Sequence, residues 1–217
     1  MMPYRTTQFG NNYFYHVFNR GVEKRIIFTT DLDYQRFLKI LYYYQFSGPK
    51  PSFSMLKHFS KQGFSKNPKI VEIISYCLMP NHFHLLIKQL KDGGIQEFIR
   101  KVSNSYTKYF NTKHKRIGPL FQGNFKAKAI ETDEQLLHIS RYIHLNPFVA
   151  GLIDKLEKYP YCSYQEFIAP GKTKLTTPKT ILDFFKNPKD YQSFVNDQKD
   201  YAKTLNEIKH LLLEESS

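Results

Sequence analysis

A largely apolar run at residues 71–87, with the link Met-Pro-Asn at 79–81 in its middle, constrains the fold of this chain more than any other stretch. The segments on either side, 70–78 and 82–89, each have the length of a strand. Pro and Asn in so short a link favour a tight turn. The run therefore predicts a β-hairpin.

The second strand of this hairpin carries two histidines, His82 and His84, separated by Phe83. Side chains alternate along a strand, so the two imidazoles are expected on one face, where they form a metal-binding pair. The same pattern also fits ordinary outward positions on a half-exposed strand whose Phe83 faces the core. The pair alone does not separate these two interpretations.

A strand and a helix are predicted before the hairpin. Residues 13–19 are mostly aromatic or β-branched, and Gly21 follows them. A helix capped by Thr30 or Asp31 comes next, with apolar residues at intervals of three and four until Ser-Gly-Pro-Lys-Pro at 47–51 ends it.

A helix and a strand are also predicted after the hairpin. Apolar residues recur at helical spacing from Ile95 to Phe110, and residues 118–130 contain an alternating pattern that leads into a fourth strand. The order strand, helix, strand, strand, helix, strand predicts an α+β fold, a ferredoxin-like split βαβ antiparallel sheet with helices on one face.

A third helix carries the residues that decide the function. Thr132 and Gln135 form a capping box at its start, and Tyr142 and Asn146, four residues apart, lie on one helical face. Pro147 disfavours helix at Asn146, so we expect Asn146 in the last turn with its amide oxygen turned outward.

Two imidazoles and an amide oxygen make three protein ligands for one cation, namely His82, His84 and Asn146. A divalent ion held there would neutralise and polarise a DNA phosphate, and Tyr142 would attack the phosphorus. The alternative is that Tyr142 is a core residue with its hydroxyl at the rim of the helix.

Other residues of the same types are weaker candidates. Tyr106 and Tyr109 are followed four positions later by Phe110 and Lys113, which are not suitable ligands. For three further histidines a satisfied surface or core position is the better interpretation: His16, His138 and His144.

The charge of the chain predicts an anionic partner. Lys and Arg number 32 against 19 Asp and Glu, a net charge of +13, and the chain has 16 Tyr and 19 Phe, a composition suited to single-stranded nucleic acid. Residues 98–130 contain no acidic residue. Eight basic residues of this segment are predicted to bind DNA: Arg100, Lys101, Lys108, Lys113, Lys115, Arg116, Lys126 and Lys128.

Composition also limits compartment and domain count. Two cysteines give no disulfide framework, no apolar run reaches the length of about 18 residues that spans a membrane, and no signal sequence is recognised, so we expect a cytoplasmic protein. We expect one domain at 1–170, with an irregular insertion at about 47–69, and a C-terminal helical extension at 171–217.

Four blocks in this order resemble the single-tyrosine HUH transposases, and most closely the REP-associated tyrosine transposases, relatives of small insertion-sequence transposases: MPNHFHLLI, GPLFQGNFKAKAI, RYIHLNPFVAGL and YPYCSY. The resemblance runs from about Tyr13 to Phe167. Asn146 stands where insertion-sequence members have Gln, as in the REP-associated branch. Phe121 and Tyr161 replace a frequent Trp.

The resemblance implies a nuclease that binds single-stranded DNA next to a hairpin and cuts it with Mg²⁺ or Mn²⁺, as a monomer or homodimer associated with the nucleoid. By the same resemblance His82 and His84 match the metal ligands, Asn146 the third ligand, and Tyr142 the nucleophile on its helix. The product is a 5′-phosphotyrosine link and a free 3′-hydroxyl. A catalytically silent regulator that binds hairpin DNA with the same fold is the alternative.

Overall fold

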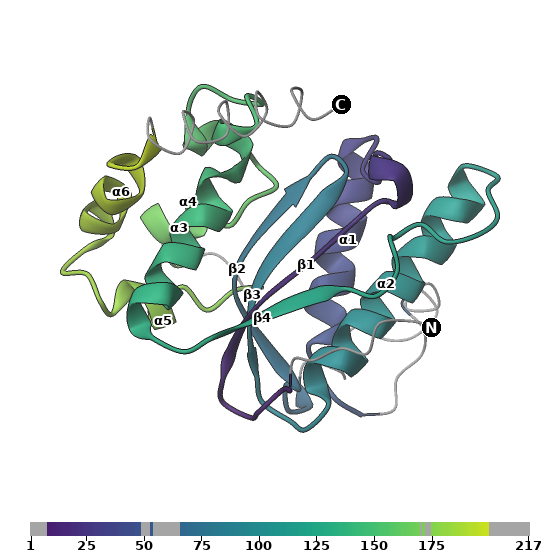
Figure 1. Ribbon diagram of the computed structural model, residues 1–217, viewed down its shortest axis with the longest axis horizontal. Coiled ribbons are helices and arrows are strands. Elements are labelled where there is room, and N and C mark those ends of the chain that lie inside the picture. Colours follow the sequence, from purple (N-terminus) through teal and green to yellow (C-terminus); the bar gives the residue numbers. More distant parts are fainter. Residues whose placement is uncertain (1–7, 49–52, 54–65, 170, 172–174, 200–217) are drawn as a thin grey trace, which may run out of the picture.

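A computed structural model of the chain describes residues 8–48, 53, 66–169, 171 and 175–199. It consists of one four-stranded antiparallel sheet between two layers of helices (Figure 1). The strands are β1 (Phe14–Arg20), β2 (Val71–Met79), β3 (His82–Gln89) and β4 (Lys126–Ile130), in the spatial order β2-β3-β1-β4. The helices are α1 (Asp31–Tyr44), α2 (Gly94–Lys113), α3 (Asp133–Val149), α4 (Tyr164–Ile168), α5 (Lys179–Leu182) and α6 (Pro188–Asn196), with short 3₁₀ turns at Val22–Lys24 and Leu156–Lys158.

The predicted α+β class and the order strand, helix, strand, strand, helix, strand are confirmed. The hairpin joins β2 to β3 through a turn at Pro80 and Asn81, and β3 has the predicted bounds. β3 lies between β2 and β1. Each of the two βαβ units, β1-α1-β2 and β3-α2-β4, therefore contributes one central strand and one edge strand. This position explains why the hairpin sequence is so apolar, because β3 is covered on both faces.

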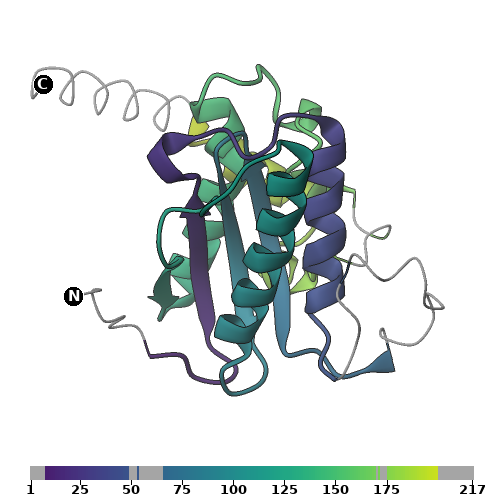
Figure 2. The same ribbon diagram turned by 90° about the vertical axis from the view of Figure 1, so that its right-hand side faces the viewer.

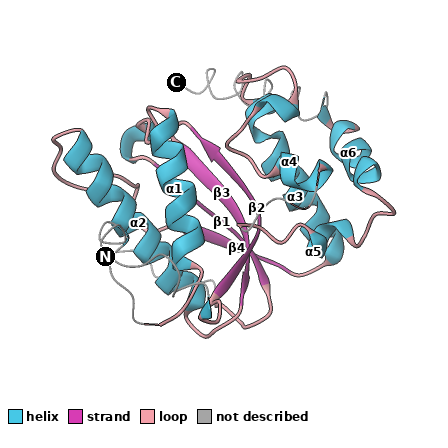
Figure 3. Cartoon of the chain, turned by 180° about the vertical axis from the view of Figure 1, so that it is seen from behind, coloured by secondary structure: helices cyan, strands magenta, loops and turns pink. Residues whose placement is uncertain are grey.

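Alternate residues of β3 supply the two halves of the core. Phe83 and Leu85 pack toward α1 and α2, whereas Leu86 packs toward α3. Figure 2 shows α1 and α2 lying side by side across one face of the sheet. The prediction of helices on one face is correct for these two helices. The other face is partly covered by α3 and the helices after it (Figure 3).

The buried carboxylate of Asp33 ties α1 to α2. Its side chain accepts hydrogen bonds from Thr29, from the Tyr109 hydroxyl at 2.9 Å and from the Lys113 ammonium at 2.7 Å. Burial alone raises the pKa of the carboxyl group, but the bonds from Lys113, Thr29 and Tyr109 outweigh it and hold the pKa well below its usual range. Asp33 also completes a capping box with Thr30 at the start of α1, as expected of that cap.

The helices after α3 pack back onto the domain. Tyr191 and Val195 of α6 are fully buried in the core that lies between α3 and the sheet. Of the expected extension at 171–217, the residues beyond 199 lie outside the part of the chain that the structure describes, as does most of the insertion expected at 47–69. Among the described helices, none is long and apolar enough to cross a bilayer.

The expected place of Asn146 in the last turn of α3 is confirmed. The helix continues through Pro147 to Val149, so Asn146 lies three residues before its last residue. Pro147 lacks an N–H and leaves the carbonyl of Ile143 without its helical partner, but it is buried and close to the helix end, where only one bond is lost. Asn146 still turns its side chain toward the sheet, as described below.

Candidate active site

The four residues predicted to form a metal and nucleophile site meet on the α3 face of the sheet. The imidazole rings of His82 and His84 are 5.0 Å apart between centroids. The ring of Tyr142, which comes from α3, stands edge-on to His84 with centroids 5.5 Å apart. The Asn146 side chain lies near enough to the His82 ring to raise its pKa. Residues separated by about 60 positions in the chain therefore converge at one place.

Strand register explains why the histidines face α3. In the antiparallel pairing of β3 with β1, His82 lies opposite Arg20 and His84 opposite Phe18. In the pairing of β1 with β4, Lys128 lies opposite His16 and Lys126 opposite Phe18. Directly opposite residues point to the same face of a sheet. The site is consequently surrounded by basic side chains from β1 and β4.

His82 has one ring nitrogen engaged and the other directed at α3. Its Nδ1 hydrogen-bonds the amide oxygen of Asn81 at 2.6 Å, and the amide nitrogen of Asn81 donates in turn to the carbonyl of Lys24. This orientation of Asn81 makes Nδ1 of His82 the protonated nitrogen. Nε2 therefore carries the lone pair, and it is the nitrogen left to face Asn146.

Asn146 turns its amide oxygen toward His82. Its amide nitrogen donates to the backbone carbonyl of Tyr142 at 3.4 Å, one helical turn earlier. The amide oxygen raises the pKa of that imidazole, because it can accept a hydrogen bond only from the protonated ring. Two imidazoles and one amide oxygen thus lie beside one another, a donor set that suits a divalent cation such as Mn²⁺.

Burial keeps both histidines in the neutral form that a metal ligand requires. It is the main cause that lowers the pKa of His82, with the Asn146 side chain acting in the opposite direction and Arg20 adding to the decrease. It lowers the pKa of His84 further, and the neighbouring His82 and His16 act in the same direction. Both rings are consequently uncharged at neutral pH.

Tyr142 combines contact with the histidines and access from solvent. Its side chain is 48% exposed, although its ring touches both His84 and His16. The competing tyrosines of α2 are engaged elsewhere: the Tyr106 hydroxyl donates to the carbonyl of Ile27, and that of Tyr109 to Asp33. Among these three, Tyr142 is the one placed to meet a substrate at the histidine pair.

His144 has a structural role, although it lies between Tyr142 and Asn146 in sequence. Its Nε2 contacts the Ser163 hydroxyl at 2.9 Å and its Nδ1 the Tyr191 hydroxyl at 2.7 Å. The Tyr191 hydroxyl also contacts the Ser140 hydroxyl at 2.6 Å. His144 is thus fully hydrogen-bonded on the far side of α3, in line with the expectation of a core histidine. His138 is exposed and contacts Arg141.

Sequence reasoning missed three residues around the site. His16 of β1 contacts His84, Arg20 lowers the pKa of His82, and Asn81 of the turn orients the His82 ring. Asn81 directly precedes the histidine strand, so its position was a usable signal. His16 and Arg20 share an alternating face of the first strand, but only the pairing of β1 with β3 shows that this face meets the histidines.

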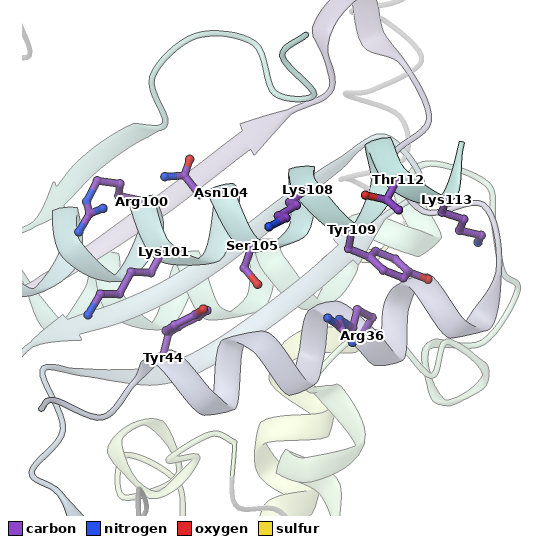
Figure 4. A pocket seen from close by; sticks show the side chains of 10 residues that line it. All are labelled: Arg36, Tyr44, Arg100, Lys101, Asn104, Ser105, Lys108, Tyr109, Thr112 and Lys113. Atoms are coloured by element: carbon purple, nitrogen blue, oxygen red, sulfur yellow. The ribbon is translucent and has the colours of Figure 1, made fainter. Parts of the chain in front are cut away.

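The eight basic residues predicted to bind DNA fall into separate places. Lys126 and Lys128 lie on β4 beside the site. Four line a groove of about 560 Å³ between α1 and α2, and Lys115 and Arg116 lie in the loop after α2. We call this groove the α1–α2 groove (Figure 4); its lining residues are Arg36, Tyr44, Arg100, Lys101, Asn104, Ser105, Lys108, Tyr109, Thr112 and Lys113.

Two of these charges are partly compensated by acids outside the acid-free segment. Lys101 pairs with Glu97 at 2.6 Å, one turn earlier on α2, and Lys113 pairs with the buried Asp33 at 2.7 Å. Arg100 and Lys108 have no ion-pair partner among the described residues. The positive character of the groove therefore rests mainly on these two and on Arg36.

Comparisons with known proteins identify similar sequences and folds. The family model "Transposase IS200 like" matches residues 56–146, the segment that contains all four site residues. A Haemophilus influenzae protein assigned to the REP-associated tyrosine transposases is 25% identical over 104 residues, 43% of this chain. The match covers 58% of that relative's length.

A solved structure has the same fold. The structure of a REP-associated tyrosine transposase bound to a REP hairpin superposes with a TM-score of 0.56 and 15% identity, over 82% of this chain and 91% of that one. A transposase structure from Deinococcus radiodurans gives a TM-score of 0.37 at 13% identity, over 66% of this chain and 95% of that one. The predicted resemblance is thereby confirmed: in the segment that carries the site this chain is similar to the IS200-like transposases, and its fold is that of a REP-associated tyrosine transposase.

Proposed function

We propose that this protein is a metal-dependent transposase that cuts and rejoins single-stranded DNA through a 5′-phosphotyrosine intermediate, with Tyr142 as nucleophile. One observation carries the proposal: an accessible tyrosine from α3 stands against a pair of neutral histidines from β3, with an amide oxygen beside them. The matching family model and the similarity to REP-associated tyrosine transposases support the same function.

The metal would be held by His82, His84 and Asn146. Nitrogen ligands favour Mn²⁺ over Mg²⁺, which prefers oxygen, although either ion fits a site that leaves positions open for phosphate and water. When bound, a divalent cation neutralises negative charge on the phosphate and polarises its P–O bonds. Among the described residues no group of three or more His, Cys, Asp and Glu could hold a metal, so this mixed donor set is the candidate.

Tyr142 performs the bond exchange in this proposal. Its phenol oxygen forms a bond to phosphorus while the bond from phosphorus to the 3′-oxygen of the preceding nucleotide breaks. The phenol loses its proton and the leaving oxygen gains one, which yields a 3′-hydroxyl and a 5′-phosphotyrosine. The phosphodiester energy is retained in that link, so a 3′-hydroxyl can reverse the step and rejoin a strand.

The DNA would follow two basic surfaces. Lys126 and Lys128 on β4 lie next to the histidines and would contact the phosphates at the cleaved position. The remaining predicted residues would bind the flanking strand or hairpin through the α1–α2 groove and the loop that follows α2: Arg100, Lys101, Lys108, Lys113, Lys115 and Arg116.

The partner that we propose is hairpin-containing single-stranded DNA. The similar structure holds a REP hairpin, and this chain shares its fold. Tyr142 and the histidines come from one chain, so a single copy contains a complete site. With DNA as its substrate, we place the activity in the cytoplasm, in association with the nucleoid.

A covalent capture experiment tests the function. The purified chain is incubated with a 3′-labelled single-stranded hairpin oligonucleotide and Mn²⁺, then boiled in detergent and separated by electrophoresis. The expected result is a labelled protein adduct that disappears with EDTA and in Tyr142→Phe. A catalytically silent regulator would instead bind the hairpin in a mobility-shift assay without any adduct, and that outcome would replace the nuclease proposal.

A further inference from the structure

The side chain of His16 is in hydrogen-bond contact with the proposed metal ligand His84. Its Nε2 lies 2.9 Å from Nδ1 of His84, and its side chain is only 5% exposed. The two residues come from neighbouring strands, where His84 lies opposite Phe18 and His16 opposite Leu86. They are therefore diagonal neighbours on one face of the sheet, a spacing that long aromatic side chains bridge.

The geometry of this contact is that of a direct hydrogen bond. The two rings are inclined by only 20°, and their centroids are 5.1 Å apart. With two ring nitrogens 2.9 Å apart, the ring centroids are farthest apart when both nitrogens lie on the line between them. The observed centroid distance is close to that maximum, so the two nitrogens point at each other. Two ligands of one cation would instead direct their lone pairs at the cation. The contact is thus a bond between the rings and leaves Nε2 of His84 free.

Neighbouring rings fix His16 in this orientation. His16 stacks on Phe18 with centroids 4.9 Å apart, and Tyr142 contacts it edge-on at 5.8 Å. A ring packed between two others loses little further freedom when it forms a hydrogen bond. His16 consequently offers a preformed partner to His84.

The hydrogen bond has a consequence for the tautomer of His84. When two neutral imidazoles share one hydrogen bond, one donates and the other accepts. If Nδ1 of His84 donates to His16, Nε2 of His84 carries the lone pair and can bind a metal. Asn81 imposes the same tautomer on His82 through its amide oxygen. Both ligands would then present Nε2, each held by a partner on Nδ1.

We infer that His16 is a positioning residue, which accepts a hydrogen bond from Nδ1 of His84 and so holds the ring of His84 with Nε2 directed into the metal site. This role rests on the metal site of the proposed function, but the tautomer itself is a property of the metal-free protein. It can therefore be tested separately from cleavage.

The first test is the tautomer of His84 in the full, metal-free chain labelled with ¹⁵N. Two-bond ¹H–¹⁵N correlation spectra at pH 7.5 distinguish the two neutral forms of each histidine. The expected result is Nδ1–H for His84 in the wild type and in His16→Gln, whose amide oxygen can accept the same bond, and loss of that preference in His16→Phe. Nε2–H in the wild type, or unchanged Nδ1–H in His16→Phe, would overturn the inference.

The second test is Mn²⁺ affinity measured by calorimetry on the same variants. Loss of a ligand's hydrogen-bond partner weakens metal binding by about 10–100-fold, which is the change expected for His16→Phe, with recovery of most of the affinity in His16→Gln. His138→Gln, an exposed histidine on α3, is the control and should bind as the wild type does. Equal affinity in all variants would exclude the positioning role.

A third readout separates positioning from direct ligation. Pulsed electron paramagnetic resonance of the Mn²⁺-loaded chain counts the coordinated imidazoles, and two are expected, whereas three would make His16 a ligand. If the wild type binds no Mn²⁺, the proposed function fails at its metal site, while the tautomer measurement still decides the role of His16. Circular dichroism of His16→Phe checks that it is folded. If it is not, the wild-type tautomer still decides the inference, because Nε2–H on His84 there would overturn it.

Discussion

Two clusters of histidine and tyrosine share helix α3, and they differ in whether their polar atoms are satisfied. We call them the open cluster and the closed cluster. The open cluster consists of His16, His82, His84, Tyr142 and Asn146. The closed cluster consists of Ser140, His144, Ser163 and Tyr191. Both combine histidine with tyrosine, on opposite sides of one helix.

Every polar atom of the closed cluster is used within the protein. Both nitrogens of His144 have hydroxyl partners, and the Ser163 hydroxyl also accepts from the backbone N–H of Tyr76. Tyr191 is fully buried, whereas Tyr142 of the open cluster is half-exposed and one nitrogen of each histidine ligand is free for a metal. Residue type therefore does not distinguish a chemical site from a structural one; unfilled hydrogen-bonding capacity and access do.

The largest expected effects come from truncating one histidine in each cluster. His82→Ala should lower the rate of adduct formation by at least about 10³-fold, because the cation contributes several kcal/mol to transition-state stabilisation, and should cost about 1 kcal/mol of stability or less. His144→Ala should cost about 3 kcal/mol, because it leaves a cavity and removes one hydrogen-bond partner from each of two buried hydroxyls, and should retain adduct formation per folded molecule.

Urea denaturation measures the loss of stability in each variant, and the covalent capture assay measures its loss of adduct formation. If His144→Ala loses adduct formation while fully folded, or if His82→Ala keeps it, the distinction between the two clusters is wrong.

A smaller effect is expected in acid, where the closed cluster contributes to the pH dependence of stability. Burial lowers the pKa of His144 from 6.5 to about 3. Below pH 6.5 His144 is therefore protonated in the unfolded chain and neutral in the folded chain. Its contribution to the free energy of unfolding is complete above pH 6.5 and is lost as the pH falls toward the pKa of the folded state. Between pH 6.5 and about pH 4.5 this one group should cost about 2 kcal/mol. Urea midpoints across this range should fall less steeply in His144→Gln; equal slopes would exclude the assignment.

The smallest effect is expected at a tyrosine outside both clusters. Tyr109→Phe removes a hydrogen bond to Asp33 but leaves the Lys113 and Thr29 bonds to that carboxylate in place. The free energy of unfolding should fall by about 1 kcal/mol, and adduct formation should not change. Loss of the adduct in this variant would transfer the nucleophile to α2 and break the comparison on which the site rests.

The sequence predicted the fold well, because the hairpin, the two flanking helices and the cap at Thr30 all depend on local patterns. It also selected the residues of the open cluster, since His82 and His84 are two apart on a strand and Tyr142 and Asn146 four apart on a helix. It did not find His16, whose contact with His84 depends on strand pairing. It also placed Asn146 correctly in the last turn of α3, because Pro147 limits how far the helix can continue.

The charge pattern was informative in a coarser way. The acid-free segment does supply basic residues to two surfaces, but Asp33 and Glu97, which lie outside it, pair with Lys113 and Lys101. The pair of Lys113 with Asp33 depends on how α1 packs against α2, which a count of charges along the chain cannot show. The pair of Lys101 with Glu97 joins residues one turn apart on α2.

The account depends on Tyr142 as the nucleophile whose phenol oxygen forms the covalent link to DNA. The most direct measurement is mass spectrometry of the trypsin-digested adduct formed with Mn²⁺ and a hairpin oligonucleotide. We predict a nucleotide phosphate on the peptide that begins at Tyr142, with the modification on that tyrosine. A modification on Tyr106, Tyr109 or any other residue, or an undiminished adduct yield from Tyr142→Phe, would contradict the account.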